Sequence, residues 1–163
     1  MITTYKFRLY PDNKQQEIFS KYFGCNRFVW NKALELRESY YKEHKNDKTR
    51  KGLNYYDTAK FIKELKQKEE YKWLKEANSQ SLQQTLIDLD KAFKTFFKGK
   101  AGHPKYKKKS NKQSFRVPQF FNFDDGVLYL PKMGKGIKME EHREFPKDKV
   151  KQLTVTKTPT NKY

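Results

Sequence analysis

The apolar pattern of the chain changes its period at Gly99. Before this residue, apolar side chains recur every three or four positions, which is the period of an amphipathic helix. The clearest stripe begins near Asn78 and consists of Leu82, Leu86, Leu89, Phe93 and Phe96. After Gly99, short extended pieces alternate with Gly and Pro, as they do in β-structure. The sequence therefore predicts an α+β fold whose helices and strands come from separate parts of the chain.

Four helices are predicted before Gly99, because four residues there can cap a helix N-terminus: Asp12, Asn26, Asn54 and Asn78. The first two helices, 12–23 and 26–40, are separated at Gly24 and imitate a helix-turn-helix, a motif that enters DNA grooves. We expect this pair to pack against the other helices instead, because it carries Phe28, Val29, Trp30 and Leu34.

Strands are predicted at both ends of the chain. Within residues 4–10, Tyr5, Phe7 and Leu9 alternate with the charged Lys6 and Arg8, the two-residue period of a half-buried strand. Four more strands are predicted at residues 113–117, 127–130, 136–139 and 150–157. The economical architecture is a β-barrel or sheet formed by residues 1–10 and 99–163, with a helical bundle of residues 11–98 inserted after the first strand.

The charge of the chain points to a polyanionic partner. The formal net charge is +18 and the isoelectric point is near 9.8, which is far more than solubility requires. The mean hydropathy of −1.13 is typical of disordered chains, but 13 Phe, 11 Tyr and 2 Trp favour a folded one. No apolar run approaches the ~20 residues that span a bilayer. We expect no membrane partner and a cytoplasmic, nucleoid-associated location.

The stretch from Lys91 to Phe123, called the basic tract below, has ten positive charges and no acidic residue. Lysine side chains neutralise phosphates and release condensed counterions. Four of the aromatic residues interleaved with them could stack on bases: Tyr106, Phe115, Phe120 and Phe121. The tract is therefore a predicted nucleic-acid-binding segment; the competing interpretation is a solvated lysine face beside an aromatic core. The predicted phosphate-binding residues are Lys98, Lys100, Lys105, Lys107, Lys108, Lys109, Lys112 and Arg116.

No pattern in the chain predicts catalysis. The three histidines are far apart in sequence, and there is no HExxH motif or glycine-rich phosphate loop. Cys25 is the only cysteine, which excludes an internal disulfide and favours a buried thiol. The pairs Asp124-Asp125 and Glu140-Glu141 are poor metal ligands, because adjacent side chains in a strand point to opposite faces. We expect neither catalytic nor metal-binding residues.

Five segments of the chain closely resemble the N-terminal half of the TnpB (OrfB) family. They are YKFRLYP at 5–11, FGCNRFVWNKALELR at 23–37, GHPKYKKK at 102–109, QSFRVPQ at 113–119 and LYLPKMGKGIKM at 128–139. TnpB proteins are RNA-guided DNA endonucleases encoded by insertion sequences and related to the type V CRISPR effectors. The resemblance implies a wedge β-barrel, a helical recognition lobe, and two partners, a guide RNA derived from the transposon end and target DNA.

The resemblance also implies which residues read a short motif in the target DNA. By matching segments these are Tyr55, Ser79, Gln83, Phe121 and Asn122. Ser79 and Phe121 differ from the polar or basic side chains that are usual in the family, which implies either a different motif preference or a small shift in how the segments match.

Cleavage in the family belongs to a RuvC-like domain that holds two divalent metals, and a four-cysteine zinc element lies later still. The resemblance places both beyond Tyr163, so we expect Mg²⁺ and Zn²⁺ only there and no cutting by this chain. The segment from Thr154 also enters a hairpin turn and stops where the returning strand should begin. A truncated chain fits this pattern, as does an ordinary frayed terminus.

Two alternatives remain at this point. The chain could be a freestanding transposase-derived DNA-binding protein or repressor that uses the helix pair within residues 12–40 and needs no RNA. It could also be a packaging protein that coats RNA without selecting one.

Overall fold

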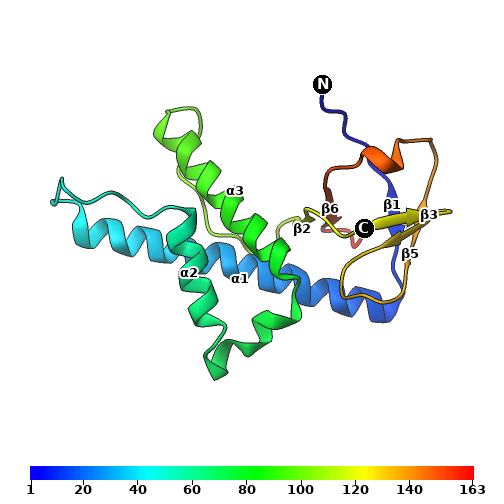
Figure 1. Ribbon diagram of the computed structural model, residues 1–163, viewed down its shortest axis with the longest axis horizontal. Coiled ribbons are helices and arrows are strands. Elements are labelled where there is room, and N and C mark those ends of the chain that lie inside the picture. Colours follow the sequence, from blue (N-terminus) through cyan, green and yellow to red (C-terminus); the bar gives the residue numbers. More distant parts are fainter.

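A computed structural model describes all residues, 1–163, and confirms the α+β class. The helices are α1 (Asn13–His44), α2 (Tyr55–Leu65), the 3₁₀ helix η1 (Glu69–Glu76) and α3 (Ser79–Phe97). The strands are β1 (Arg8–Tyr10), β2 (Gln113–Val117), β3 (Asn122–Asp124), β4 (Val127–Tyr129), β5 (Ile137–Glu140) and β6 (Leu153–Lys157), with a 3₁₀ turn η2 (Lys147–Lys149) before β6. The helices gather at one end of the molecule and the strands at the other, and α1 extends into both halves (Figure 1). None of the helices has the length and apolar character of a membrane span.

Helix α1 is a single helix of 32 residues. It begins with the predicted cap, in which the Asp12 carboxylate accepts from the Gln15 N–H at 2.8 Å and the Gln15 side chain accepts from the Asp12 N–H at 2.9 Å. The predicted break at Gly24 is wrong. Gly24 lies inside the helix, where buried Phe23 and Cys25 on either side hold the chain in its helical path. Residues 12–40 therefore do not form a helix-turn-helix pair.

Asn26, predicted to cap a second helix, instead joins α1 to α3. Its side-chain amide donates to the Tyr22 carbonyl at 2.8 Å, and its side-chain oxygen accepts from the Thr85 hydroxyl at 2.6 Å. Both side chains are buried, and burial strengthens the need for each polar group to find a partner. Asn26 thus fixes the register between α1 and α3 and does not begin a helix.

The other helix ends agree with the prediction. The Asn54 side chain accepts from the Asp57 N–H at 3.2 Å, and the Asn78 side chain accepts from the Gln80 N–H at 3.2 Å. Helix α3 ends just before Gly99, which has a φ of +71°. There the Gly99 N–H donates to the Phe96 carbonyl at 2.9 Å and the Lys100 N–H donates to the Thr95 carbonyl at 3.1 Å, the pattern of a Schellman cap.

The strands form two antiparallel sheets. One has the order β1-β5-β4-β3, and the other pairs β2 with β6. As predicted, the first strand of the chain joins C-terminal strands, with Leu9 opposite Met139. The predicted barrel is not observed, because the two sheets share no strand and do not close. Pro118 lacks an N–H directly after β2, and Phe120 has a φ of +64°, so the chain turns away before β3 begins.

Strand β3 is absent from the predicted strands. It pairs with β4 through a two-residue turn at Asp125 and Gly126, whose φ values are +45° and +73°. An Asp-Gly pair between extended segments favours this type I′ turn, so the signal is present in the sequence. From the sequence, Asp125 is considered only as a poor metal ligand. In the structure it forms the hairpin turn.

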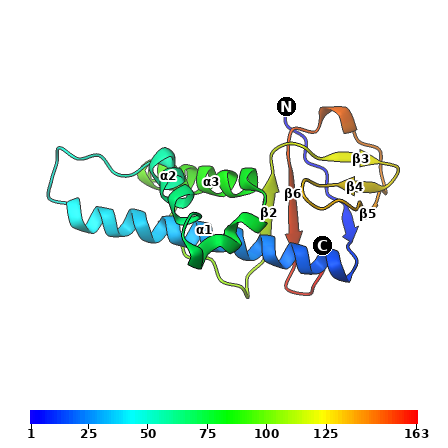
Figure 2. The same ribbon diagram turned by 60° about the horizontal axis from the view of Figure 1, so that its bottom comes forward.

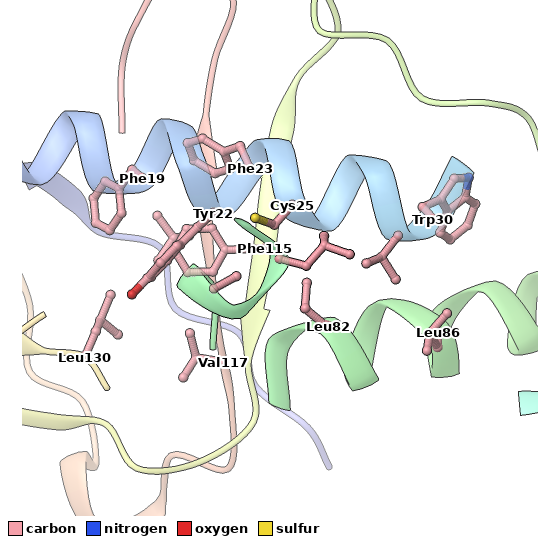
Figure 3. Close-up of a cluster of buried hydrophobic side chains, with 14 of the residues drawn as sticks. Phe19, Tyr22, Phe23, Cys25, Trp30, Leu82, Leu86, Phe115, Val117 and Leu130 are labelled. Atoms are coloured by element: carbon pink, nitrogen blue, oxygen red, sulfur yellow. The ribbon is translucent and has the colours of Figure 1, made fainter. Parts of the chain in front are cut away.

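The aromatic core lies where the two halves meet. Phe115 of β2 packs against three side chains of α1, with ring centroids 5.7 Å from Phe19, 5.5 Å from Tyr22 and 5.3 Å from Phe23 (Figure 3). Cys25 lies beside this cluster and is 2% exposed, which confirms the predicted buried thiol. Burial raises the pKa of its thiol to about 11, so the group stays protonated and unreactive near neutral pH.

The continuity of α1 can be tested at Gly24. An added Cβ would meet only the Arg27 Nη2 at 3.8 Å, an ordinary contact. We expect Gly24→Ala to stabilise the fold by about 0.5–1 kcal/mol, because alanine loses less backbone entropy in a helix interior. Urea unfolding followed by circular dichroism measures the change. A marked loss of stability would instead indicate a turn at this position.

Candidate nucleic-acid interface

The basic tract follows the fold in three parts. It begins in the last turns of α3, continues as an irregular segment over residues 98–112, called the crossover below, and ends in β2 and the approach to β3. The crossover returns from the end of α3 past α1 to reach β2 (Figure 2). The tract thus connects the helical half of the molecule to the sheets.

Side chains of α1 hold the crossover in place. The Trp30 indole N–H donates to the Lys105 carbonyl at 2.9 Å. Asn31 binds both backbone groups of Lys107, donating to its carbonyl at 3.0 Å and accepting from its N–H at 2.7 Å. These bonds replace the ladder that a strand would provide, because backbone polar groups need partners even in irregular segments. The crossover therefore has a defined path without regular secondary structure.

The predicted phosphate-binding lysines are all exposed, and none of them forms an ion pair. Among the lysines and the arginine of the basic tract, two form ion pairs: Lys94, 3.0 Å from Asp90, and Arg116, 3.2 Å from Asp88. Arg116 is half-buried and already has an anionic partner, so it is the least available of the eight predicted residues. The others are free to meet a polyanion.

Lys107 differs from its neighbours in the crossover. The residue as a whole is exposed, but its ammonium group lies over the Trp30 ring, 4.2 Å from the centroid. Loss of solvation there lowers the pKa of the ammonium, while Asp88 acts in the opposite direction and Arg116 adds to the lowering. An anion next to this group would favour the charged form, which loss of solvation disfavours.

The aromatic residues of the tract have different surroundings. Phe115 is 3% exposed, so the prediction that it stacks on bases is wrong, because its ring belongs to the core. The Tyr106 hydroxyl donates to the Glu38 carboxylate at 2.8 Å, and burial together with this carboxylate raises its pKa to about 12. Phe121 is half-buried against Phe123.

Among the four aromatic residues predicted to stack on bases, Phe120 is the best placed. Its side chain is 73% exposed, and its φ of +64° is a left-handed conformation that bulky residues rarely adopt. Strain of this kind occurs most often at functional sites. A surface position that tolerates both an exposed ring and a strained backbone is a candidate contact for a base.

The predicted DNA-motif residues lie on three elements. Ser79 and Gln83 are exposed and one turn apart at the start of α3, Tyr55 is the half-buried first residue of α2, and Asn122 is the exposed first residue of β3. Helix α2 belongs to the helical half and β3 to the sheet half (Figure 1). These residues do not share one pocket, so only an extended ligand could meet them together.

No three His, Cys, Asp or Glu side chains come close enough to hold an ion. Asp125 sits in the turn after β3, and His103 packs edge-on against Phe93 and Phe96 at centroid distances of 5.4 and 5.1 Å. Arg37 and Asp90 form a buried pair at 3.0 Å that joins α1 to α3 and has a structural role.

Two residues of α1 position the crossover in a way that the sequence does not predict. Trp30 and Asn31 shape the crossover, yet the sequence pattern assigns Trp30 only a packing role and does not single out Asn31. Their contacts with the crossover span 75 and 76 residues, so no local spacing could reveal them. The only sequence feature that could have indicated these contacts is the adjacent indole and amide of Trp30 and Asn31 on one helix.

The sequence matches a family model and several named proteins. The family model HTH_OrfB_IS605, a helix-turn-helix domain, matches residues 1–46. Two relatives bear the name "Putative RNA-guided DNA endonuclease": InsQ of Escherichia coli (strain K12), 36% identical over 82% of this chain and 32% of InsQ, and a protein of Streptomyces pristinaespiralis, 34% identical over 87% of this chain and 35% of that protein. The virulence protein VsdF of Salmonella dublin is 36% identical over 69% of this chain and 98% of VsdF.

The α+β fold and these relatives define a protein of a transposon-associated family. The chain belongs to the TnpB (OrfB) family. It spans about a third of the length of the two relatives named as endonucleases. Within residues 1–46, which the helix-turn-helix family model covers, residues 13–44 of this chain are one continuous helix.

Neutralising the crossover tests its role. We expect replacement of Lys105, Lys107, Lys108 and Lys109 by glutamine to weaken RNA binding across sequences, because fewer neutralised phosphates release fewer counterions. The slope of log affinity against log salt should fall by about 0.7 for each phosphate that the protein no longer neutralises. The matched control replaces Lys42, Lys45, Lys48 and Lys51, four exposed lysines outside the tract. Equal slopes for the two variants would show that only net charge matters.

Proposed function

We propose that this chain binds a guide RNA and the target DNA beside a short recognition motif, and that it does not cut nucleic acid on its own. The observation that carries the proposal is the anchored crossover, whose lysines are exposed and free of acidic partners, in a chain of the TnpB family. Both partners are inferred from two relatives, each of which is named "Putative RNA-guided DNA endonuclease".

The RNA is assigned to the crossover and to the exposed Phe120. Lysines along an irregular segment follow a folded RNA backbone more readily than a rigid duplex groove, and exposed rings stack on unpaired bases. The family wedge would then comprise the two sheets, with β1, β5, β4 and β3 in one and β2 and β6 in the other. We infer that this wedge holds the RNA scaffold.

The DNA motif is assigned to α3 and β3. Gln83 and Asn122 are exposed amides, and amide side chains can form paired hydrogen bonds with adenine in the major groove. Ser79, Tyr55 and Phe121 would support them through contacts to the backbone or to base faces. None of these roles requires a metal, so we propose binding without a cofactor in these residues.

The strongest competitor is a freestanding DNA-binding protein that needs no RNA. It would have used a helix pair within residues 12–40, but that stretch contains no turn between two helices. The exposed lysines of the crossover would also suit a packaging protein that coats RNA. Selection of one RNA over bulk RNA separates these functions.

The first test is what co-purifies with the chain. Expressed together with the end of its transposon, the protein should retain one discrete RNA after a moderate salt wash, and excess transfer RNA should displace that RNA poorly. Binding to one duplex sequence without any RNA would contradict the proposal. So would DNA cleavage at millimolar magnesium that Asp124→Asn and Asp125→Asn abolish.

A second test separates reading of the DNA motif from RNA binding. With the RNA bound, Gln83→Ala and Asn122→Ala should each relax the choice among randomised target-adjacent sequences, since each amide–base contact is worth about 1–3 kcal/mol of discrimination. Their affinity for the RNA should match that of the wild type. Lys138→Ala, an exposed substitution on β5, is the control. Variants at Gln83 and Asn122 that lose RNA affinity and keep motif choice would reverse the assignment.

A further inference from the structure

A polar pocket of about 210 Å³ opens between α1, α3 and the end of the crossover. Asn26 and Arg27 of α1 and Thr85 of α3 form its back, and Phe23 is its one apolar residue. The front comes from residues 107–114, namely Lys107, Lys108, Asn111, Lys112, Gln113 and Ser114. No acidic residue lines it. Four of the ten lining residues are therefore cationic, in a space too small for a nucleic-acid duplex.

The walls of this pocket are held by hydrogen bonds within the protein. Asn31 fixes the backbone of Lys107 from both sides, as described above. The Asn111 N–H donates to the Lys108 carbonyl at 3.2 Å, which closes a turn, and Arg27 Nη1 donates to the Gln113 side-chain oxygen at 2.8 Å. The turn is therefore tied to α1 at both ends. Cations held in place lose little freedom when a ligand binds.

The unused groups in the pocket are mainly donors. No hydrogen bond or ion pair engages the ammonium groups of Lys107, Lys108 or Lys112. The acceptors of Asn26 and Gln113 are already occupied, by Thr85 and Arg27. A nucleobase edge presents donors as well as acceptors, whereas a phosphate presents acceptors and negative charge only. The surplus of cationic donors fits a phosphate.

We propose that this pocket receives one phosphate group of a single-stranded segment of the bound RNA. The proposal rests on the proposed function, because RNA is taken as the bound polyanion. A single strand can direct one phosphate into a recess, since its backbone is not held in a regular helix. The remaining crossover lysines then follow the neighbouring phosphates outside the pocket. The anion also compensates the reduced solvation of Lys107.

The decisive variants fill the pocket without changing charge. Ser114 is exposed on β2 and lines the pocket, and Asn111 is exposed in the turn, so Ser114→Phe and Asn111→Phe place a ring in the space. Ser110→Phe is the matched control, because Ser110 is an exposed residue of the same turn that does not line the pocket. All three variants keep every lysine. The probe is an unstructured uridine oligonucleotide bound by the full chain.

We expect each filling variant to weaken binding about tenfold, since hydrogen bonds to charged groups are worth about 1.5–3 kcal/mol. The control variant should bind as the wild type does, and thermal unfolding should confirm that all three fold. If Ser114→Phe does not fold, Asn111→Phe decides the question. Filling variants that bind like the wild type would refute the pocket.

A second pair of variants checks the role of charge. Lys107→Gln with Lys112→Gln removes two cations from the pocket, and Lys105→Gln with Lys109→Gln removes two from the crossover outside it. The pocket pair should weaken binding about tenfold more than the outside pair at equal salt. Equal effects would overturn the proposal, and an effect confined to duplex DNA would overturn the assignment to RNA. If the wild type binds no RNA, the proposed function itself fails.

Discussion

The packing of Phe115 against α1 is the interaction on which the rest of the structure depends. This ring lies among Phe19, Tyr22 and Phe23 and joins a strand in the second half of the chain to a helix near its beginning. Burying a ring of this size contributes about 1.5–3 kcal/mol relative to leaving it exposed. Because β2 pairs with β6, the same ring fixes the small sheet to the helix. The two halves therefore share one core.

Helix α1 can serve both halves because it does not break. Its 32 residues extend about 48 Å at 1.5 Å per residue. Near its start, Gln15 donates to the Gly136 carbonyl at 2.9 Å and so contacts the segment before β5. Further along, Asn26 binds Thr85 and Arg37 binds Asp90, which set the position of α3. A turn at Gly24 would have separated these two sets of interactions.

Most of the features that could be predicted from the sequence are local, although the pairing of the first strand with C-terminal strands was also predicted. Asp12, Asn54 and Asn78 act as caps because capping needs only the next few residues, and Gln113–Val117 is a strand with the predicted bounds. Gly24 resembles a helix end, but the buried residues around it keep α1 intact, and this packing is tertiary. Closure of a barrel depends on registers between distant strands, which alternation within one strand does not encode.

At the candidate interface, too, only part of the result could be predicted from the sequence. Composition predicts the crossover lysines, but the fold decides whether they are free to bind an anion. Burial acts to raise the pKa of Asp90, but hydrogen bonds from Lys94 and Arg37 outweigh this effect and lower the pKa. The carboxylate is therefore charged at neutral pH and paired with Lys94 and Arg37. The other nearby acids also have internal partners, Glu38 with Tyr106 and Asp88 with Arg116. The crossover lysines lack partners because the fold has already used these acids. The unpaired lysines therefore remain free to bind a phosphate backbone.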